Sequence, residues 1–406
     1  MRKTIPYTSI LKYLIKINIL WSVIAPLILA LITMVFSNSL IFILKDIIFY
    51  LSFILIFFLP NRFFNISDKI RLLLYILGFL LFLLITTSFL HSFHFWQVYN
   101  LRQFLAPIMI VSFLSFVKIP FEFNKRMILF ILKVVVLLTL LGFIFQLINI
   151  WEFINLSNFF QAKGIPTYDN GTPAMFFEPS MNYMPRLVST ILDPISFGHI
   201  ITAAFVSLFF LKSIKKNRRK LYLFILIVGL FLTMSKGAIF QLVICVFLFN
   251  PRLNIFFRLF IPLSTLVAGF FLIDLKGIII HFKGLYFALI NANLFGHGLG
   301  MVGNYARMFA DDLTIYHKMN ISDTFIGSVL GQIGVVGLFF WASFFSRYFI
   351  DLIRQIIMPG SIIIVSQLII SVLSENTLNL TSFFIPGLLA VLVNKYQLYE
   401  NSNTRN

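Results

Sequence analysis

Apolar runs of about 20 residues recur along the chain from one end to the other, and they limit the fold more than any other feature. Each run is long enough for a helix to cross the roughly 30 Å hydrocarbon core of a bilayer. The runs lack strand-like alternation, so helices are expected. Charged residues make up only 11% of the chain, whereas a soluble domain has about a quarter. The sequence therefore predicts an all-α fold, a polytopic bundle of transmembrane helices that forms one integral membrane domain over residues 1–406.

About twelve spans are expected, since each needs roughly 20 residues. The seventh and eighth spans meet at Ser235-Lys236-Gly237. An even number of spans places both termini on the same side of the membrane. The expected spans cover residues 17–36, 40–59, 71–90, 99–117, 128–149, 192–211, 221–235, 237–250, 257–275, 323–345, 360–375 and 382–394.

The net charge of +18 comes from one set of connections. With a cytoplasmic N-terminus, the cytoplasmic segments carry 22 Lys and Arg against four Asp and Glu, which accounts for the whole net charge. This distribution follows the positive-inside rule, which sets orientation, so the charge does not indicate a nucleic-acid partner. We expect a multi-pass protein in contact with membrane lipids, with both termini in the cytoplasm.

Two connections, 150–191 and 276–322, are much longer than the others and are expected outside the membrane. Both carry polar, aromatic and charged residues. Long ordered loops between packed elements are usually functional. The working surface is therefore expected on the outer side, where no ATP is available.

Metal and cofactor signals are missing from the sequence. Cys245 is the only cysteine and lies within an expected span, so neither an internal disulfide nor a cysteine-based metal site is expected. No segment matches a phosphate-binding glycine loop, a zinc-binding helix motif or a nucleophile elbow. We expect no metal and no cofactor.

Four short elements resemble the O-antigen polymerase and ligase families of membrane proteins. Residues 186–198 (RLVSTILDPISFG) are similar to the "Arg … Pro … Phe-Gly" element of these families, and 235–238 (SKGA) to the element that follows it. Residues 294–300 (LFGHGLG) are similar to their glycine-rich turn, and 323–337 (DTFIGSVLGQIGVVG) to the helix after their second large loop. The four elements occur in the order and on the side of the membrane that these families show.

The resemblance implies a glycosyl transfer at the outer face of the bacterial cytoplasmic (inner) membrane. A Wzy-type polymerase joins undecaprenyl-pyrophosphate-linked oligosaccharide repeat units into O-antigen or a related surface polysaccharide. The donor carries its own leaving group, so neither a nucleotide nor a covalent enzyme intermediate is needed. The protein must supply cationic contacts for the pyrophosphate, a base for the attacking hydroxyl, and positioning. A chain-length regulator protein is a further partner that the resemblance implies.

One position separates the two families. O-antigen ligases usually carry His where this chain has Asp323. An acidic residue there resembles many polymerases and favours a polymerase, although His317, six residues upstream, could take the place of that His.

The expected catalytic residues are Arg186, Asp323 and His317. Arg suits pyrophosphate because its guanidinium is always charged and can bind phosphate through two donors. Asp or His would act as the base. The expected substrate-binding residues are Arg102, Lys236, Arg307, Asp193 and His297.

Each of these residues also has a structural explanation. Asp193 directly precedes Pro194, which is the pattern of a helix N-cap, and Asp323 lies at an expected helix start, where it could cap. Arg186 lies near the start of an expected span, where its long side chain could extend so that the guanidinium reaches the membrane surface. Arg102 needs a partner or a wet cavity inside the bilayer.

The remaining candidates have similar alternatives. Lys236 could anchor the edge of its span, and His297 lies in a glycine-rich tight turn. Arg307 and His317 could be solvated surface residues.

Two other functions compete with the polymerase. A ligase would transfer the finished glycan to lipid A-core. A lipid-linked oligosaccharide flippase would predict related halves around a central polar cavity, whereas this chain concentrates polarity in two unequal outer loops without an evident internal repeat.

Overall fold

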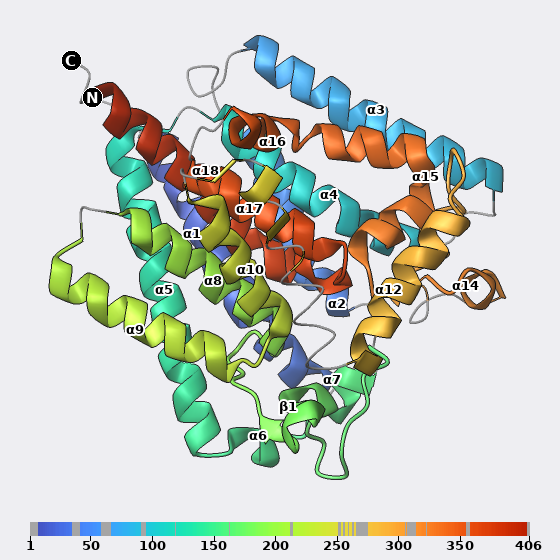
Figure 1. Ribbon diagram of the computed structural model, residues 1–406, viewed down its shortest axis with the longest axis horizontal. Helices are drawn as coiled ribbons and strands as arrows, with labels where there is room; N and C mark the ends of the chain where they lie inside the picture. Colours follow the sequence, from blue (N-terminus) through green and yellow to red (C-terminus); the bar gives the residue numbers. More distant parts are fainter. Residues whose placement is uncertain are drawn as a thin grey trace, which may run out of the picture.

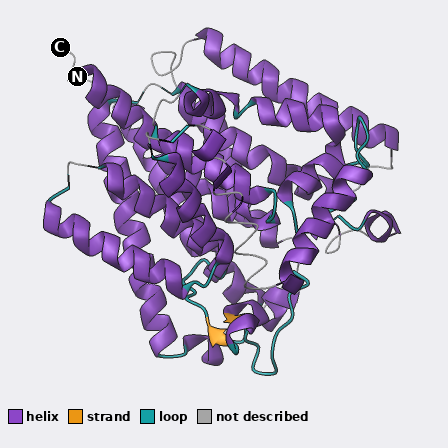
Figure 2. Ribbon diagram, in the orientation of Figure 1, coloured by secondary structure: helices purple, strands orange, loops and turns teal. Residues whose placement is uncertain are grey.

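The computed structural model is mostly helical (Figures 1 and 2), as the sequence predicts. It describes residues 7–34, 41–57, 66–90, 95–117, 119–161, 163–211, 214–250, 253–254, 256–258, 260–261, 264, 275–304, 306, 314–321, 323–354 and 358–403. The helices are α1 (Tyr7–Thr33), α2 (Ile41–Phe57), α3 (Ile66–Leu90), α4 (Phe95–Phe116), α5 (Phe121–Leu147), α6 (Ile150–Phe153), α7 (Ser157–Gln161), α8 (Pro194–Phe210), α9 (Lys216–Leu232), α10 (Lys236–Leu248), α12 (Leu275–Ile290), α14 (Thr314–Met319), α15 (Phe325–Ser343), α16 (Ser346–Ile353), α17 (Pro359–Ser371) and α18 (Leu380–Asn403).

Several helices are suited to a membrane. Among the described residues, four helices are long and apolar enough to cross one, within α1, α3, α5 and α15. Shorter apolar helices lie within α2, α8, α10 and α17. Most of the expected span 257–275 lies outside the described residues.

The two long connections contain more regular structure than the sequence predicts. Helix α12 occupies the start of the expected loop 276–322, because its apolar residues form a helix despite His281 and Lys283. The connection 150–191 holds a small antiparallel hairpin of β1 (Phe177–Glu178) and β2 (Met184–Pro185). Three-residue 3-10 turns, η2 (Ala174–Phe176) and η3 (Pro179–Met181), lie before and within this hairpin.

The connection 150–191 is a packed unit with its own apolar cluster. Trp151, Phe159, Phe160 and Phe176 are buried together and pack on Leu29 of α1. This unit lies at the opposite end of the molecule from the start of α1 and the end of α18 (Figure 1). The main core fills the bundle between the long helices, with α18 in contact with α4, α5, α8 and α17.

Helix α15 is broken at Gly334, which has φ +71°. The loop after α12 approaches the break closely. A Cβ at Gly334 would lie 2.4 Å from the backbone nitrogen of Gly296 and 2.5 Å from the oxygen of Leu294. Only glycine fits this backbone and this contact, so the break docks the glycine-rich turn 294–300 onto α15.

Candidate functional site

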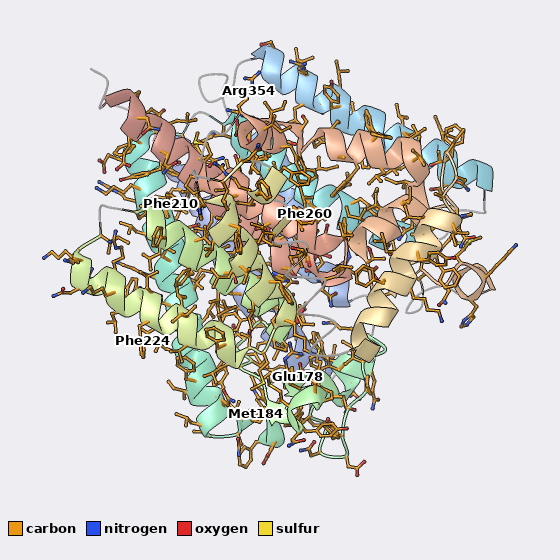
Figure 3. The ribbon with its side chains drawn as sticks, in the orientation of Figure 1. Glu178, Met184, Phe210, Phe224, Phe260 and Arg354 are labelled. Atoms are coloured by element: carbon orange, nitrogen blue, oxygen red, sulfur yellow. The ribbon has the colours of Figure 1, made fainter. Side chains whose placement is uncertain are left out.

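A cationic pair lies where the hairpin meets the start of α10. Lys236 is the first residue of α10, whose N-cap Ser235 accepts a hydrogen bond from the Ala238 backbone. Arg186 directly follows β2. Lys236 Nζ lies 3.4 Å from Glu178 Oε1, and an Arg186 Nη1 lies 3.9 Å from Glu178 Oε2. The hairpin and α10 therefore bring two cations around one carboxylate, at the end of the molecule opposite Arg354 (Figure 3).

The Arg186 side chain also holds the turn between α9 and α10. Its Nε donates to the Thr233 carbonyl oxygen over 2.9 Å, and its Nη2 donates to that of Met234 over 3.4 Å. Met234 has φ +48°, an uncommon conformation for this residue type. Arg186 thus stabilises the turn that precedes Lys236, while the Nη1 of Arg186 faces Glu178.

Charge and burial oppose one another at this pair. Burial disfavours the ionised form of Glu178, but the Ser180 hydrogen bond and the charges of Lys236 and Arg186 outweigh it, so its pKa is lowered. Burial lowers the pKa of Arg186, although the charges of Glu178 and Asp193 counteract this. Glu178 is therefore an anion held by two cations.

Asp193 caps α8, which is the structural role expected from the sequence as the alternative to substrate binding. Its Oδ1 accepts from the backbone nitrogens of Ile195 over 2.9 Å and Ser196 over 3.3 Å. Its Oδ2 accepts from the Ser196 hydroxyl, which is also 2.6 Å from the hydroxyl of Ser382. Asp193 therefore acts electrostatically on Arg186 while its oxygens serve the helix start.

A second cluster surrounds Asp323. The N-cap of α15 is Thr324, whose hydroxyl accepts from the Gly327 backbone over 3.1 Å, so Asp323 lies outside the cap. Asp323 has φ +56°, and its Oδ1 accepts from Asn304 Nδ2 over 2.8 Å. The Asn304 backbone donates to Glu375 Oε2 over 2.8 Å. Asn304 thus links two carboxyl groups.

Glu375 is the most unusual titratable group of this cluster. It begins the 3-10 turn η4 (Glu375–Leu378), which lies between α17 and α18 and outside both helices. The residue is only 2% exposed. Burial and the charge of Asp323 raise its pKa to about 8, although hydrogen bonding to Asn304 and Gln103 counteracts the rise. Its proton is therefore exchangeable near neutral pH.

The turn η4 links the carboxyl cluster around Asp323 to the start of α8. It contacts α8, α15, α17 and α18. The Ser382 hydroxyl donates to the carbonyl oxygen of Asn376 within η4 and also lies beside the Ser196 hydroxyl, which contacts Asp193. The carboxyl cluster of α15 and the capped start of α8 are therefore neighbours through one short turn.

The other expected site residues lie elsewhere. Arg102 pairs with Asp46 of α2, which is the polar link between helices that the sequence offers as an alternative. His297 Nε2 is 3.0 Å from the Asn291 carbonyl oxygen, within the loop after α12. His317 is exposed on α14. Arg307 lies outside the described residues.

Glu178 and Glu375 are absent from the residues that the sequence nominates. Glu178 lies in the first long connection, but only the hairpin register brings it back to Arg186. Glu375 is the last residue of the expected span 360–375, where an acidic residue simply indicates that the span has ended. An acidic residue beside a buried run is the one signal that could have identified it.

Comparisons with known proteins do not indicate a function, so the function must be inferred from the site. No protein-family model matches the chain, and no curated protein or solved structure shows significant similarity to it. Within the part of the chain that the structure describes, no group of three or more His, Cys, Asp or Glu side chains could hold a metal ion. What the site offers is a cationic pair, and a buried carboxyl that can exchange a proton.

Proposed function

We propose that this protein is a membrane-embedded polymerase of lipid-linked glycans. The observation that carries the proposal is the cationic pair Arg186 and Lys236. Helix α8, whose cap Asp193 acts electrostatically on Arg186, contacts the η4 turn that bears Glu375. Together these groups match the two needs of glycosyl transfer from a pyrophosphate, a contact for the leaving group and a base for the acceptor.

Arg186 and Lys236 would bind the pyrophosphate of an undecaprenyl-pyrophosphate-linked oligosaccharide. Negative charge grows on the pyrophosphate as its bond to the sugar breaks, and two fixed cations stabilise that charge. The Arg186 side chain is 9% exposed, so its charge is little screened by water. Its backbone contacts fix its orientation before the substrate arrives, which favours catalysis.

Glu375 would accept the proton of the attacking hydroxyl, with Asp323 and Asn304 holding it in place. With a pKa of about 8, a minor fraction of Glu375 is ionised at neutral pH, and this ionised form is the one that takes up the proton. The acceptor oxygen then bonds to the anomeric carbon of the donor. The bond from that carbon to the pyrophosphate oxygen breaks, and undecaprenyl pyrophosphate leaves.

The same proposal places about twelve spans in the bacterial inner membrane, with 150–191 and 276–322 outside and both termini in the cytoplasm. The charge distribution supports this orientation. The hairpin that carries Glu178 and the end of α18 lie at opposite ends of the molecule, which is consistent with this orientation (Figures 1 and 3).

The test uses purified protein with undecaprenyl-pyrophosphate repeat units and no nucleotide. A ladder of longer glycans is expected from the wild type and none from Arg186→Ala, with both proteins inserted in membranes. A folded wild type that gives no ladder with any repeat unit contradicts the proposal. Transfer only to added lipid A-core would indicate a ligase, and passage into liposomes without elongation would indicate a transporter.

A further inference from the structure

The Glu178 carboxylate occupies the position between the two cations where an anionic ligand would bind. It is 3.9 Å from Arg186 and 3.4 Å from Lys236, and both separations exceed those of a close charged hydrogen bond. The shorter contact of the carboxylate is with its own loop, because the Ser180 hydroxyl donates to it over 2.6 Å. Glu178 therefore neutralises the cations, and the Ser180 hydrogen bond helps to hold it beside them.

Arg186 keeps its place independently of Glu178. Arg186 is held by the carbonyl oxygens of Thr233 and Met234. The backbone of Lys236 is fixed as the first residue of α10, a helix of 13 residues with a capped N-terminus. Departure of the carboxylate would thus leave a preformed anion site with two positive charges at a helix N-terminus.

The tip of the hairpin that carries Glu178 is exposed. At this tip Met181, Tyr183 and Met184 each expose more than half of their surface. Asn182 and Tyr183 both have positive φ, at 53° and 56°. Glu178 therefore lies close in sequence to an exposed loop tip.

We propose that Glu178 is a built-in competing anion that must leave the Arg186–Lys236 site when a pyrophosphate group enters and that returns to displace it. This inference rests on the proposed function, because it assigns the pyrophosphate of the lipid-linked donor and product to this site. Transfer of the glycan leaves a pyrophosphate with one more negative charge than the donor had, so the product binds two cations more strongly. An internal carboxylate lowers the affinity of the site for donor and product alike and so permits release.

Binding of inorganic pyrophosphate to the purified protein in detergent tests the inference. Isothermal titration calorimetry at constant ionic strength should give about tenfold tighter binding for Glu178→Gln than for the wild type, since the neutral amide no longer competes. Ser180→Ala removes the hydrogen bond that helps to hold the carboxylate beside the cations, so this variant should bind about two- to threefold more tightly. The exposed residue Glu152 of the same connection gives the matched control Glu152→Gln, which should bind like the wild type.

Equal or weaker pyrophosphate binding by Glu178→Gln and by Ser180→Ala overturns the inference, as does undiminished binding by Lys236→Ala. The two proposals fail separately. Glycan elongation by the wild type together with equal pyrophosphate affinities would remove the role of Glu178 and leave the polymerase. A tenfold difference in affinity without elongation under any condition would leave the competing anion and remove the polymerase.

Discussion

Replacement of Glu375 by Gln should change how the stability of the protein depends on pH. The carboxyl has a pKa of about 8 in the folded protein, against an ordinary value of 4.5. Between these two pH values the unfolded chain has released this proton and the folded protein still holds it. The free energy of unfolding therefore falls as the pH rises through this window, and it levels off above the folded pKa.

The size of the effect follows from the burial of Glu375. A difference of about 3.5 in pKa corresponds to about 5 kcal/mol, because each pKa unit is worth about 1.4 kcal/mol. The residue is 2% exposed, so water screens little of this penalty. Between pH 5 and pH 7 the contribution of Glu375 should fall by about 2 to 3 kcal/mol. Gln is neutral at every pH, so the variant should gain that amount of stability relative to the wild type over the same interval.

Unfolding by sodium dodecyl sulfate in mixed micelles, followed by circular dichroism at pH 5, 6 and 7, measures the difference. Glu122→Gln, at an exposed position near the start of α5, is the matched control and should run parallel to the wild type. A difference between Glu375→Gln and the wild type that stays constant from pH 5 to pH 7 would refute the reasoning, because it would mean that Glu375 titrates alike in the folded and unfolded states.

Three further changes test individual contacts. Arg186→Lys keeps the charge but loses the donor to the Thr233 carbonyl oxygen, so glycan elongation should fall at least about tenfold while pyrophosphate binding falls less; equal losses in the two assays would contradict this division. Asp193→Ala removes the α8 cap and should cost about 1 kcal/mol of unfolding free energy, whereas Asp193→Asn keeps a cap and should cost only a few tenths. Gly334→Ala forces a Cβ toward the Gly296 backbone at positive φ and should cost more than about 1 kcal/mol of unfolding free energy. A smaller loss would show that the break in α15 relaxes easily.

Local signals in the sequence predict helix starts well. The pair Asp193 and Pro194 indicates a capped helix, and α8 begins there with the expected hydrogen bonds. The division at Ser235 is also confirmed, because Ser235 caps α10. These features depend on residues at most three positions apart, so they can be identified from the sequence alone. Asp323 shows the limit of such reading, since the cap of α15 is one residue later, at Thr324.

Contacts between distant segments could not be predicted in the same way. Arg102 pairs with Asp46, which is 56 positions away in the sequence. This pair could not be predicted, because apolar periodicity does not indicate which helices are neighbours. The connection expected at 276–322 contains helix α12, because polar and charged residues in a sequence do not by themselves exclude a helix. Glu375 belongs to a carboxyl cluster only because the loop before α15 folds back and presents the Asn304 backbone to it.

The contacts of Arg186 bear on how any loss of activity at this site must be interpreted. The side chain gives its Nε and Nη2 to the turn between α9 and α10 and only its Nη1 edge to the anion position. Arg186→Ala therefore removes a structural clamp and a charge together, so an inactive variant cannot assign either role. Glu178→Gln changes the anion position and leaves both backbone contacts in place. A gain in pyrophosphate affinity from that variant separates the two roles, because a loss of packing at the turn has no means of producing tighter binding.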